Sequence, residues 1–322
     1  MKEGLRIIIS RTDGIGDVIL TLPMAYLLKK TFKNCSIIFL GRNYTKPVIE
    51  ACKYIDEVVS WDDTFGKSPS SFLSNSNADA IIHVFPDKEI VKWAFKAKIP
   101  MRIGTSHRLY NLLRCNNLVH FTRKNSHLHE AQLNIKLLKP FGINEINDKN
   151  DFSKMFGLEK IKPLNNELKS LICNKKFNLI MHPKSKGSAR EWGINNFFNL
   201  LSILPKEKYN VFITGTHKER EELNKLFENP YNKPTDLTGK LSLTELISFI
   251  NESDGLIACS TGPLHIAAAL NKKVIGIYPP IKPMHPGRWA PLGENARVIA
   301  NNKNCSNCRK STHCKCIESI SP

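Results

Sequence analysis

Short apolar runs alternate with helix-length amphipathic segments along all 322 residues of the chain. Turn-forming residues bound each run, which is typical of strands joined by helices. One run, AIIHVF at 80–85, is apolar apart from His83, as expected of a strand covered on both faces. In the first half the pattern predicts strands at 5–10, 36–40, 57–60, 80–85, 101–104 and 118–121, and helices at 17–32, 87–98 and 127–139.

The stretch 144–170 is polar and has few strand signals, so we place a linker there. The same alternation then resumes. It predicts strands at 177–181, 209–214, 255–259 and 274–278, with helices at 195–204, 219–227, 243–251 and 263–270. Repeated strand–helix units favour a parallel sheet in each half. The expected fold class is α/β, with one Rossmann-like, doubly wound domain over 1–155 and a second over 156–322.

The chain carries 47 Lys and Arg against 29 Asp and Glu, a formal charge of +18. This excess is spread over both halves, so it fits either anionic partners or a general compositional bias. No run of about 18 apolar residues is present, which argues against a membrane span. The N-terminus lacks the pattern of a secretion signal, and we therefore expect a cytoplasmic protein.

Three strand–turn–helix junctions concentrate the candidate chemistry. The first is the sequence ISRTDGIGDV, residues 9–18, in which Gly14 and Gly16 allow a sharp turn beneath a helix. Ligands of open α/β sheets bind at the carboxyl ends of strands, so Asp17 is a candidate general base. The alternative is that Asp13 and Asp17 only cap the helix and complement its dipole.

The second junction is IACSTGPLHIAAA, residues 257–269. Pro263 suits the first turn of a helix, and the free N–H groups there suit a diphosphate. Ser260 and Thr261 add hydroxyl groups, Gly262 completes the turn, and His265 lies within reach of the same ligand. On its own, His265 would be interpreted as an ordinary half-buried histidine.

The third junction is HPKSKGSAREWG, residues 182–193. Lys186 and Arg190 place positive charge where a departing phosphate would need it. A solvated basic loop is the alternative interpretation.

In this order and spacing, the three junctions resemble glycosyltransferase family 9, the heptosyltransferase family of lipopolysaccharide core assembly. The similarity is strongest in RTDGIGDVILTLP, HPKSKGSAREWG and STGPLHIAAAL. It implies a GT-B-like fold whose two domains face a central cleft, with the acceptor on the N-terminal domain and the donor on the C-terminal domain. It also implies an inverting transfer without a metal cofactor, an ADP-heptose or similar nucleotide-sugar donor, and an anionic glycolipid acceptor on the inner membrane surface, which the protein would contact peripherally.

The resemblance also assigns residues. Asp17 falls on the catalytic base of the family, and Arg190 stands where the family usually has a lysine at the donor phosphate. Thr261, Gly262 and His265 match the donor-binding turn.

Two further positions are less regular. Glu219 resembles an acidic residue near the nucleoside or sugar of the donor. Ser260 replaces an aspartate that often precedes Thr-Gly in the family, which leaves the identity of the sugar and of the nucleotide open.

Basic side chains of the first domain are candidate contacts for acidic groups of the acceptor. They are equally compatible with solvated surface charges. The candidates are Arg11, Arg42, Arg102 and Arg108.

Four cysteines near the C-terminus, Cys305, Cys308, Cys314 and Cys316, have a spacing compatible with a structural zinc site. Free thiols or a disulfide are the alternatives.

Two other classes of protein compete with the glycosyltransferase. A sugar-nucleotide epimerase of the GT-B fold would share the two-domain plan. A basic nucleic-acid-binding protein fits less well, because the chain lacks RNP-like aromatic residues, a recognition-helix pattern and basic arms. We therefore expect no nucleic-acid partner.

Overall fold

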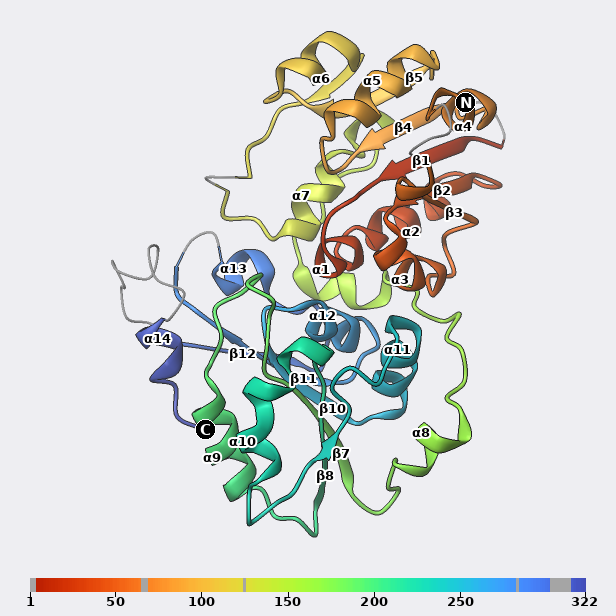
Figure 1. Cartoon of the computed structure of the whole chain (residues 1–322). Helices are drawn as coiled ribbons and strands as arrows, with labels where there is room; N and C mark the ends of the chain where they lie inside the picture. The colour runs from red at the N-terminus through yellow and green to blue at the C-terminus, as the bar shows by residue number, and fades with distance from the viewer. Residues whose placement is uncertain (1–3, 65–68, 124–125, 282–283, 302–313) are drawn as a thin grey trace. The chain divides into compact units, whose positions relative to one another are not determined.

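The computed structural model describes residues 4–64, 69–123, 126–281, 284–301 and 314–322. The chain divides into two compact units, Met1–Lys160 and Ile161–Pro322, called unit 1 and unit 2 below. This division falls five residues after the position expected from the sequence. Each unit contains one parallel six-stranded sheet, so the predicted pair of doubly wound sheets is present (Figure 1).

The sheet of unit 1 has the order β3-β2-β1-β4-β5-β6. The order reverses between the parallel neighbours β1 and β4: from β1 the next strands along the chain add on one side, and from β4 they add on the other. Such a reversal leaves a crevice at the carboxyl ends of the two central strands, the usual ligand site of this fold. The strands are β1 (Arg6–Ser10), β2 (Ser36–Gly41), β3 (Glu57–Ser60), β4 (Ala80–His83), β5 (Met101–Thr105) and β6 (Asn117–Val119).

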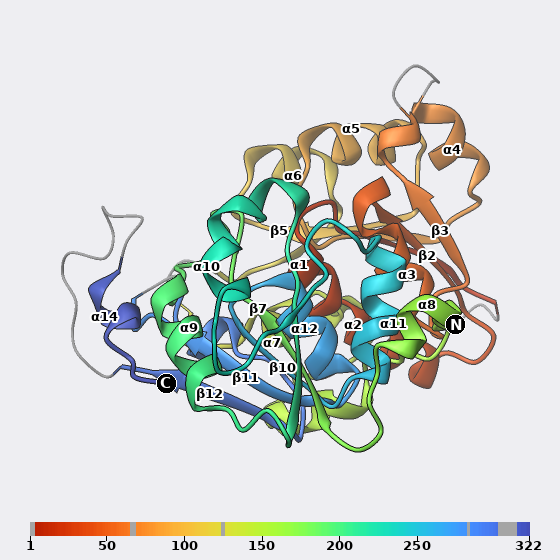
Figure 2. The same ribbon diagram turned by 60° about the horizontal axis from the view of Figure 1, so that its bottom comes forward.

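Helices cover both faces of this sheet. Ile8, Ile38 and Ile81 form a core with side chains of α4 and α5 on one face, and α6 lies beside α5 (Figure 2). Helices α2 and α7 pack against each other. The helices are α1 (Ile15–Ile19), α2 (Leu22–Thr31), α3 (Lys46–Glu50), α4 (Pro69–Asn75), α5 (Lys88–Lys96), α6 (Leu109–Arg114) and α7 (Glu130–Lys136).

The prediction of one helix over 17–32 is wrong. The segment forms α1 and α2, which are separated at Leu20 and Thr21. Pro23 lies at the start of α2, where its missing N–H costs no helical hydrogen bond. Because of this break, the helix that carries Asp17 has only five residues.

The sheet of unit 2 has the order β12-β11-β10-β7-β8-β9. Counted within the unit, this is the same order as in unit 1, and the reversal falls between β7 and β10. Edge strands β9 and β12 were not predicted. The strands are β7 (Phe177–His182), β8 (Tyr209–Ile213), β9 (Thr235–Asp236), β10 (Gly255–Cys259), β11 (Lys273–Tyr278) and β12 (Ala296–Ala300).

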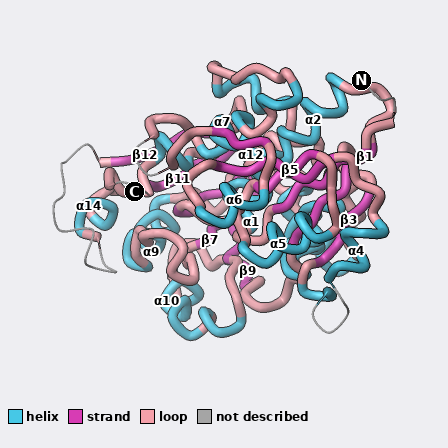
Figure 3. The backbone as a smooth tube through the Cα atoms, turned by 90° about the horizontal axis from the view of Figure 1, so that it is seen from above, coloured by secondary structure: helices cyan, strands magenta, loops and turns pink. Residues whose placement is uncertain are grey.

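Helices also alternate with the strands of unit 2, as the cyan and magenta segments of Figure 3 show. The core beneath α9, α10 and α14 contains Trp192, Phe197 and Ile317. On the other face α11 packs against α12. The helices are α8 (Asn166–Ser170), α9 (Ile194–Ile203), α10 (Asn224–Phe227), α11 (Leu243–Glu252), α12 (Gly262–Ala269), α13 (Pro286–Trp289) and α14 (Lys315–Glu318).

Across the described part of the chain, every helix is too short or too polar to cross a membrane.

Candidate active site

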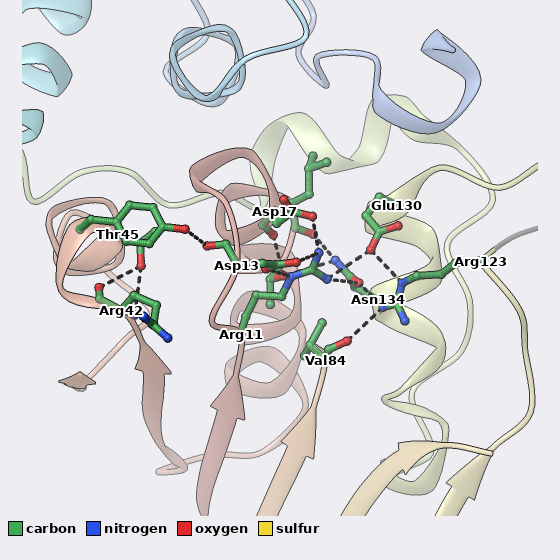
Figure 4. Close-up of polar contacts among 12 residues, drawn as sticks. Arg11, Asp13, Asp17, Arg42, Thr45, Val84, Arg123, Glu130 and Asn134 are labelled. Atoms are coloured by element: carbon green, nitrogen blue, oxygen red, sulfur yellow. Dashed lines mark hydrogen bonds and ion pairs between the residues drawn. The ribbon is translucent and has the colours of Figure 1, made fainter. Parts of the chain in front are cut away.

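The turn after β1 builds a cluster of charges at the reversal point of unit 1. Arg11 directly follows the strand and is 3% exposed. Its Nε and Nη2 donate to the two carboxylate oxygens of Asp13 at 2.6 and 3.0 Å. Nη2 also donates to Oδ1 of Asp17. The guanidinium group therefore holds both carboxylates of the turn in fixed positions (Figure 4).

Helix α7 completes this cluster from a distant part of the chain. Nη1 of Arg11 donates to Glu130 at 3.2 Å and to Asn134 at 3.3 Å. Arg123 donates to the same two side chains, at 2.9 Å and 3.1 Å. It also reaches the carbonyl of Val84, just after β4, at 3.2 Å. The cluster thus ties the ends of β1 and β4 to α7.

The carboxyl group of Asp17 is well suited to accept a proton. Burial raises its pKa from 3.8 to about 6; Arg11 opposes this rise, and the charges of Asp13 and Glu130 add to it. Oδ1 is held by Arg11, whereas Oδ2 meets no hydrogen-bond donor within the described residues. The side chain keeps 23% exposure. Near neutral pH it is an oriented, ionised carboxylate with one open oxygen.

Gly14 makes room for that oxygen. A methyl group added at this glycine would lie 2.9 Å from Oδ2 of Asp17, closer than ordinary packing contacts. The backbone angles of Gly14, φ −63° and ψ 161°, are open to any residue. The glycine is therefore needed for space and not for its conformational freedom.

Arg11 does not have the role expected from the sequence. All five N–H groups of an arginine are engaged here by four side chains of unit 1. No donor remains for an acidic group of the acceptor. Arg11 positions Asp17 instead.

Arg102 is also placed unlike the prediction. It lies near the amino end of β5, whereas ligand sites lie at the carboxyl ends. Its Nε donates to the carbonyl of Arg114 at 2.7 Å, and its Nη1 to the carbonyl of Ile99 at 2.5 Å. These bonds connect Arg102 to the last residue of α6 and to the loop after α5. Its guanidinium group is therefore directed away from a site at the carboxyl ends of the strands.

Arg42 and Arg108 do lie at the carboxyl edge. Arg42 follows β2 and forms an ion pair with Asp62 at 2.7 Å. Arg108 is exposed at the start of α6. These two remain the candidate acceptor contacts of unit 1.

A second pair of polar side chains was not predicted. Ser10 and His83 end β1 and β4 and are direct neighbours in the ladder. Both are fully buried, and neither Oγ of Ser10 nor the ring nitrogens of His83 have a hydrogen-bond partner among the described residues. Burial, with the charge of Arg102, lowers the pKa of His83 to about 3, so the ring is neutral.

In unit 2 the predicted donor turn forms at the end of β10. Thr261 is the N-cap of α12, Gly262 is its first residue, and Pro263 follows. The first N–H groups of a helix have no partner inside it, and Pro263 has none to offer. The backbone donors of this first turn are therefore those of Gly262 and Leu264.

Two side chains at this helix start have unsatisfied polar atoms. Thr261 and His265 are 5% and 4% exposed, and Oγ1 of Thr261 and Nδ1 of His265 make no hydrogen bond to described residues. Burial lowers the pKa of His265 to about 4, so its ring is neutral at pH 7. Such buried atoms usually have a partner, which points to a ligand at this turn. Ser260 precedes Thr261 and is half-buried.

The end of β7 lies beside β10, since His182 is the register partner of Ala258. Nδ1 of His182 is 2.9 Å from Oγ1 of Thr214. Glu219 is buried, and its Oε2 accepts from N and Oγ1 of Thr216 at 2.7 and 2.8 Å. Glu219 thus shapes the turn after β8, at the same edge of the sheet as the donor turn.

The basic loop after β7 is folded around Glu191. This carboxylate accepts from Nζ of Lys184 at 2.7 Å and from N and Oγ of Ser185 at 2.9 and 3.0 Å. Glu191 therefore balances the positive charge of Lys184. Lys186 is exposed in the same loop, and Arg190 is half-buried. The predicted donor contacts Lys186 and Arg190 both lie in this loop.

The cysteines are only partly described. Cys305 and Cys308 lie outside the described residues. Cys314 is 1% exposed and packs in the core of unit 2 with Ile317, and Cys316 packs against the same core. Among the described residues, no group of three or more metal-binding side chains is placed to hold an ion.

The sequence model of glycosyltransferase family 9 (heptosyltransferase) matches residues 73–317. The chain belongs to this family and is a glycosyltransferase. This membership favours a transferase over the epimerase and the nucleic-acid-binding protein.

Individual relatives agree with this assignment. The chain is 24% identical over 330 residues to lipooligosaccharide heptosyltransferase 2 of Campylobacter jejuni, covering 99% of this chain and 96% of that protein. Among solved structures it resembles the E. coli ADP-heptose LPS heptosyltransferase II, with a TM-score of 0.73, 16% identity, and coverage of 98% and 95%. It also resembles the E. coli heptosyltransferase WaaC with ADP, with a TM-score of 0.71, 15% identity, and coverage of 92% and 93%. The GT-B-like fold class is thereby confirmed.

Proposed function

We propose that this enzyme transfers a heptose from an ADP-heptose type of donor to a sugar hydroxyl of a lipopolysaccharide-core glycolipid, with inversion at the anomeric carbon. The observation that carries the mechanism is Asp17: its pKa is about 6, one oxygen is fixed by Arg11, and the other is open. A general base works best when its pKa lies near the working pH.

The donor diphosphate would bind at the first turn of α12. This turn offers the free N–H groups of Gly262 and Leu264 and the positive end of the helix dipole. The unsatisfied atoms of Thr261 and His265 supply two more contacts. The E. coli heptosyltransferase of similar fold was solved with ADP, which supports a nucleotide diphosphate as the ligand class.

The transfer would proceed in one displacement. Asp17 takes the proton of the acceptor hydroxyl as its oxygen forms a bond to the anomeric carbon. The bond from that carbon to the diphosphate oxygen breaks on the opposite face. The charge of the departing ADP is stabilised by the helix N-terminus and by Arg190 and Lys186. Glu219 and Ser260 would contact the nucleoside or sugar from the neighbouring strand ends.

Acidic groups of the acceptor would pair with Arg42 and Arg108 at the carboxyl edge of unit 1. Such an acceptor is anchored in the inner membrane, so we expect the enzyme to act at its cytoplasmic face.

We propose that no metal ion takes part in the transfer, because the helix N-terminus and the basic loop already supply positive charge for the leaving group. A chelator in the assay should leave the rate unchanged. The separate hypothesis of a structural zinc ion at Cys305, Cys308, Cys314 and Cys316 is tested by metal analysis of protein purified without chelator.

The experiment that tests the proposed function incubates the enzyme with ADP-heptose and a lipopolysaccharide core that lacks heptose, and follows the mass of the acceptor. We expect one added heptose with inverted anomeric configuration by NMR. Incubation with the donor alone serves as the control. Conversion of the donor to an isomer without acceptor would contradict the proposal and favour an epimerase.

A further inference from the structure

Helix α6 of unit 1 has its apolar side turned to the solvent. Leu109, Leu112 and Leu113 recur at the spacing of one helix face, and their exposed fractions are 71%, 49% and 67%. The side that faces the sheet instead carries Asn111, which is fully buried and donates to the carbonyl of Thr105 at 2.9 Å. A helix of a globular protein normally has the opposite arrangement.

Two more exposed apolar side chains extend this surface. Leu118 of β6 is 41% exposed and is the register partner of Gly104. A methyl group on Gly104 would touch Asn111 of α6. Because register partners point to the same face of a sheet, Leu118 lies on the α6 side.

Phe95 of α5 is 48% exposed and belongs to the helix that packs against α6. The guanidinium of Arg102 lies 5.4 Å from its ring centre and also donates to the carbonyl of Arg114, the last residue of α6. Helices α5 and α6 lie side by side in Figures 1 and 2. We call the side chains of Phe95, Leu109, Leu112, Leu113 and Leu118 the α6 patch.

The segment that carries the α6 patch is strongly basic, although Asp87 and Glu89 lie just before it at the start of α5. The sequence from 90 to 123 contains no Asp or Glu. It contains seven basic residues, namely Lys92, Lys96, Lys98, Arg102, Arg108, Arg114 and Arg123. Of these, Lys96, Lys98 and Arg108 are exposed. This net positive charge complements an anionic surface.

We propose that the α6 patch docks this enzyme on an anionic phospholipid bilayer, with the leucines inserted among the headgroups and the basic residues on the lipid phosphates. Exposed leucines with a basic rim are the composition of interfacial membrane anchors. A second copy of the chain fits the surface poorly, because a two-fold dimer would set the patch against itself and bring like charges together. The proposal does not depend on the identity of donor or acceptor.

The test is co-sedimentation of the full chain with vesicles of phosphatidylglycerol and phosphatidylethanolamine, compared with vesicles of phosphatidylcholine alone. We expect binding to the anionic vesicles only, and a marked loss of binding at high salt. The double variant L109S/L113S should bind at least about tenfold more weakly, since two apolar side chains no longer leave water. Its melting temperature should stay unchanged because both leucines are exposed.

The matched control is I203S, which removes an exposed apolar side chain (63%) from α9 of unit 2. It should bind vesicles as the wild type does. Lys96→Ala, at an exposed basic residue of α5, should weaken binding to anionic vesicles by about fivefold, the contribution of one basic residue at such a surface.

Three results would overturn the proposal. The first is equal binding of the wild type to both kinds of vesicle. The second is unchanged binding of L109S/L113S. The third is a concentration-dependent dimer that the double variant dissolves while vesicle binding persists, which would make the α6 patch a contact between copies.

Discussion

Replacing Asp17 by Asn separates the proposed proton-accepting role of this carboxylate from its structural role. Asn has the shape of a protonated Asp, and its Oδ1 can still accept from Arg11. It cannot take a proton from the acceptor hydroxyl. We expect kcat to fall by about 10²–10⁴, the usual contribution of general base catalysis, while the affinity for ADP stays unchanged.

The same variant should be more stable than the wild type at neutral and alkaline pH. The folded protein raises the pKa of Asp17 from 3.8 to about 6, so it favours the protonated form. The stabilisation is complete below the unfolded value and is lost as pH rises through the folded value. A shift of about two pKa units corresponds to up to about 3 kcal/mol of stability lost at about pH 8.

Asn at this position avoids that loss because it never ionises. The melting temperature of D17N should exceed that of the wild type at about pH 8, by about 2–4 °C for each kcal/mol in a unit of this size. The difference should shrink as the pH is lowered through 6 and should disappear below the unfolded pKa of 3.8, where Asp17 is protonated in both states.

The assay combines ADP release, measured by chromatography, with thermal unfolding across the pH range. Asp151→Asn, a substitution of an exposed aspartate in the same unit, is the matched control and should change neither property. A D17N enzyme with near-normal kcat would refute the base assignment. A variant less stable than wild type at about pH 8 would refute the electrostatic argument even if activity were lost.

Three further predictions concern the same two sites. Gly14→Ala places a methyl group 2.9 Å from Oδ2 of Asp17, so kcat should fall at least about tenfold with a melting temperature near wild type; unchanged kcat would show that the side chain of Asp17 can move freely. Glu130→Gln removes a charge that raises the pKa of Asp17, so the acid limb of kcat/KM should shift below about pH 6, and a shift upward would contradict the cluster. Thr261→Val removes the proposed hydroxyl donor to the diphosphate, so the Kd for ADP measured by calorimetry should rise by about 10–100-fold. The control Thr31→Val, at the exposed end of α2, should leave the Kd unchanged. Equal Kd values for both variants would place the diphosphate elsewhere.

The sequence was sufficient for the local parts of this molecule. Each junction is a strand end, a turn and a helix start, so apolar runs and glycines located Asp17 and Thr261 without any distant contact. The edge strands β9 and β12 were missed for a physical reason as well. β9 has only two residues, and β12 is largely exposed, so neither has the apolar run by which a buried strand is detected.

Distant contacts were beyond sequence reasoning. Glu130 and Asn134 lie on a helix that looks ordinary in sequence, and nothing near them signals that they accept hydrogen bonds from Arg11 beside Asp17. The same limit explains the error at Arg11, since basic residues are mostly exposed and its burial follows from partners on another helix. Only the fold brings these side chains together.

The engagement of Arg11 by four side chains has a consequence for how the enzyme loses function. The orientation of the Asp17 carboxylate is fixed when the chain folds, so the proposed base needs no reorganisation in each catalytic cycle. Two of the anchors belong to α7, and the first of them lies 119 positions further along the chain. Detachment of α7 alone would release Arg11 and Asp17 from their fixed positions while both sheets stayed intact. Activity should therefore be lost at a lower temperature than the β structure.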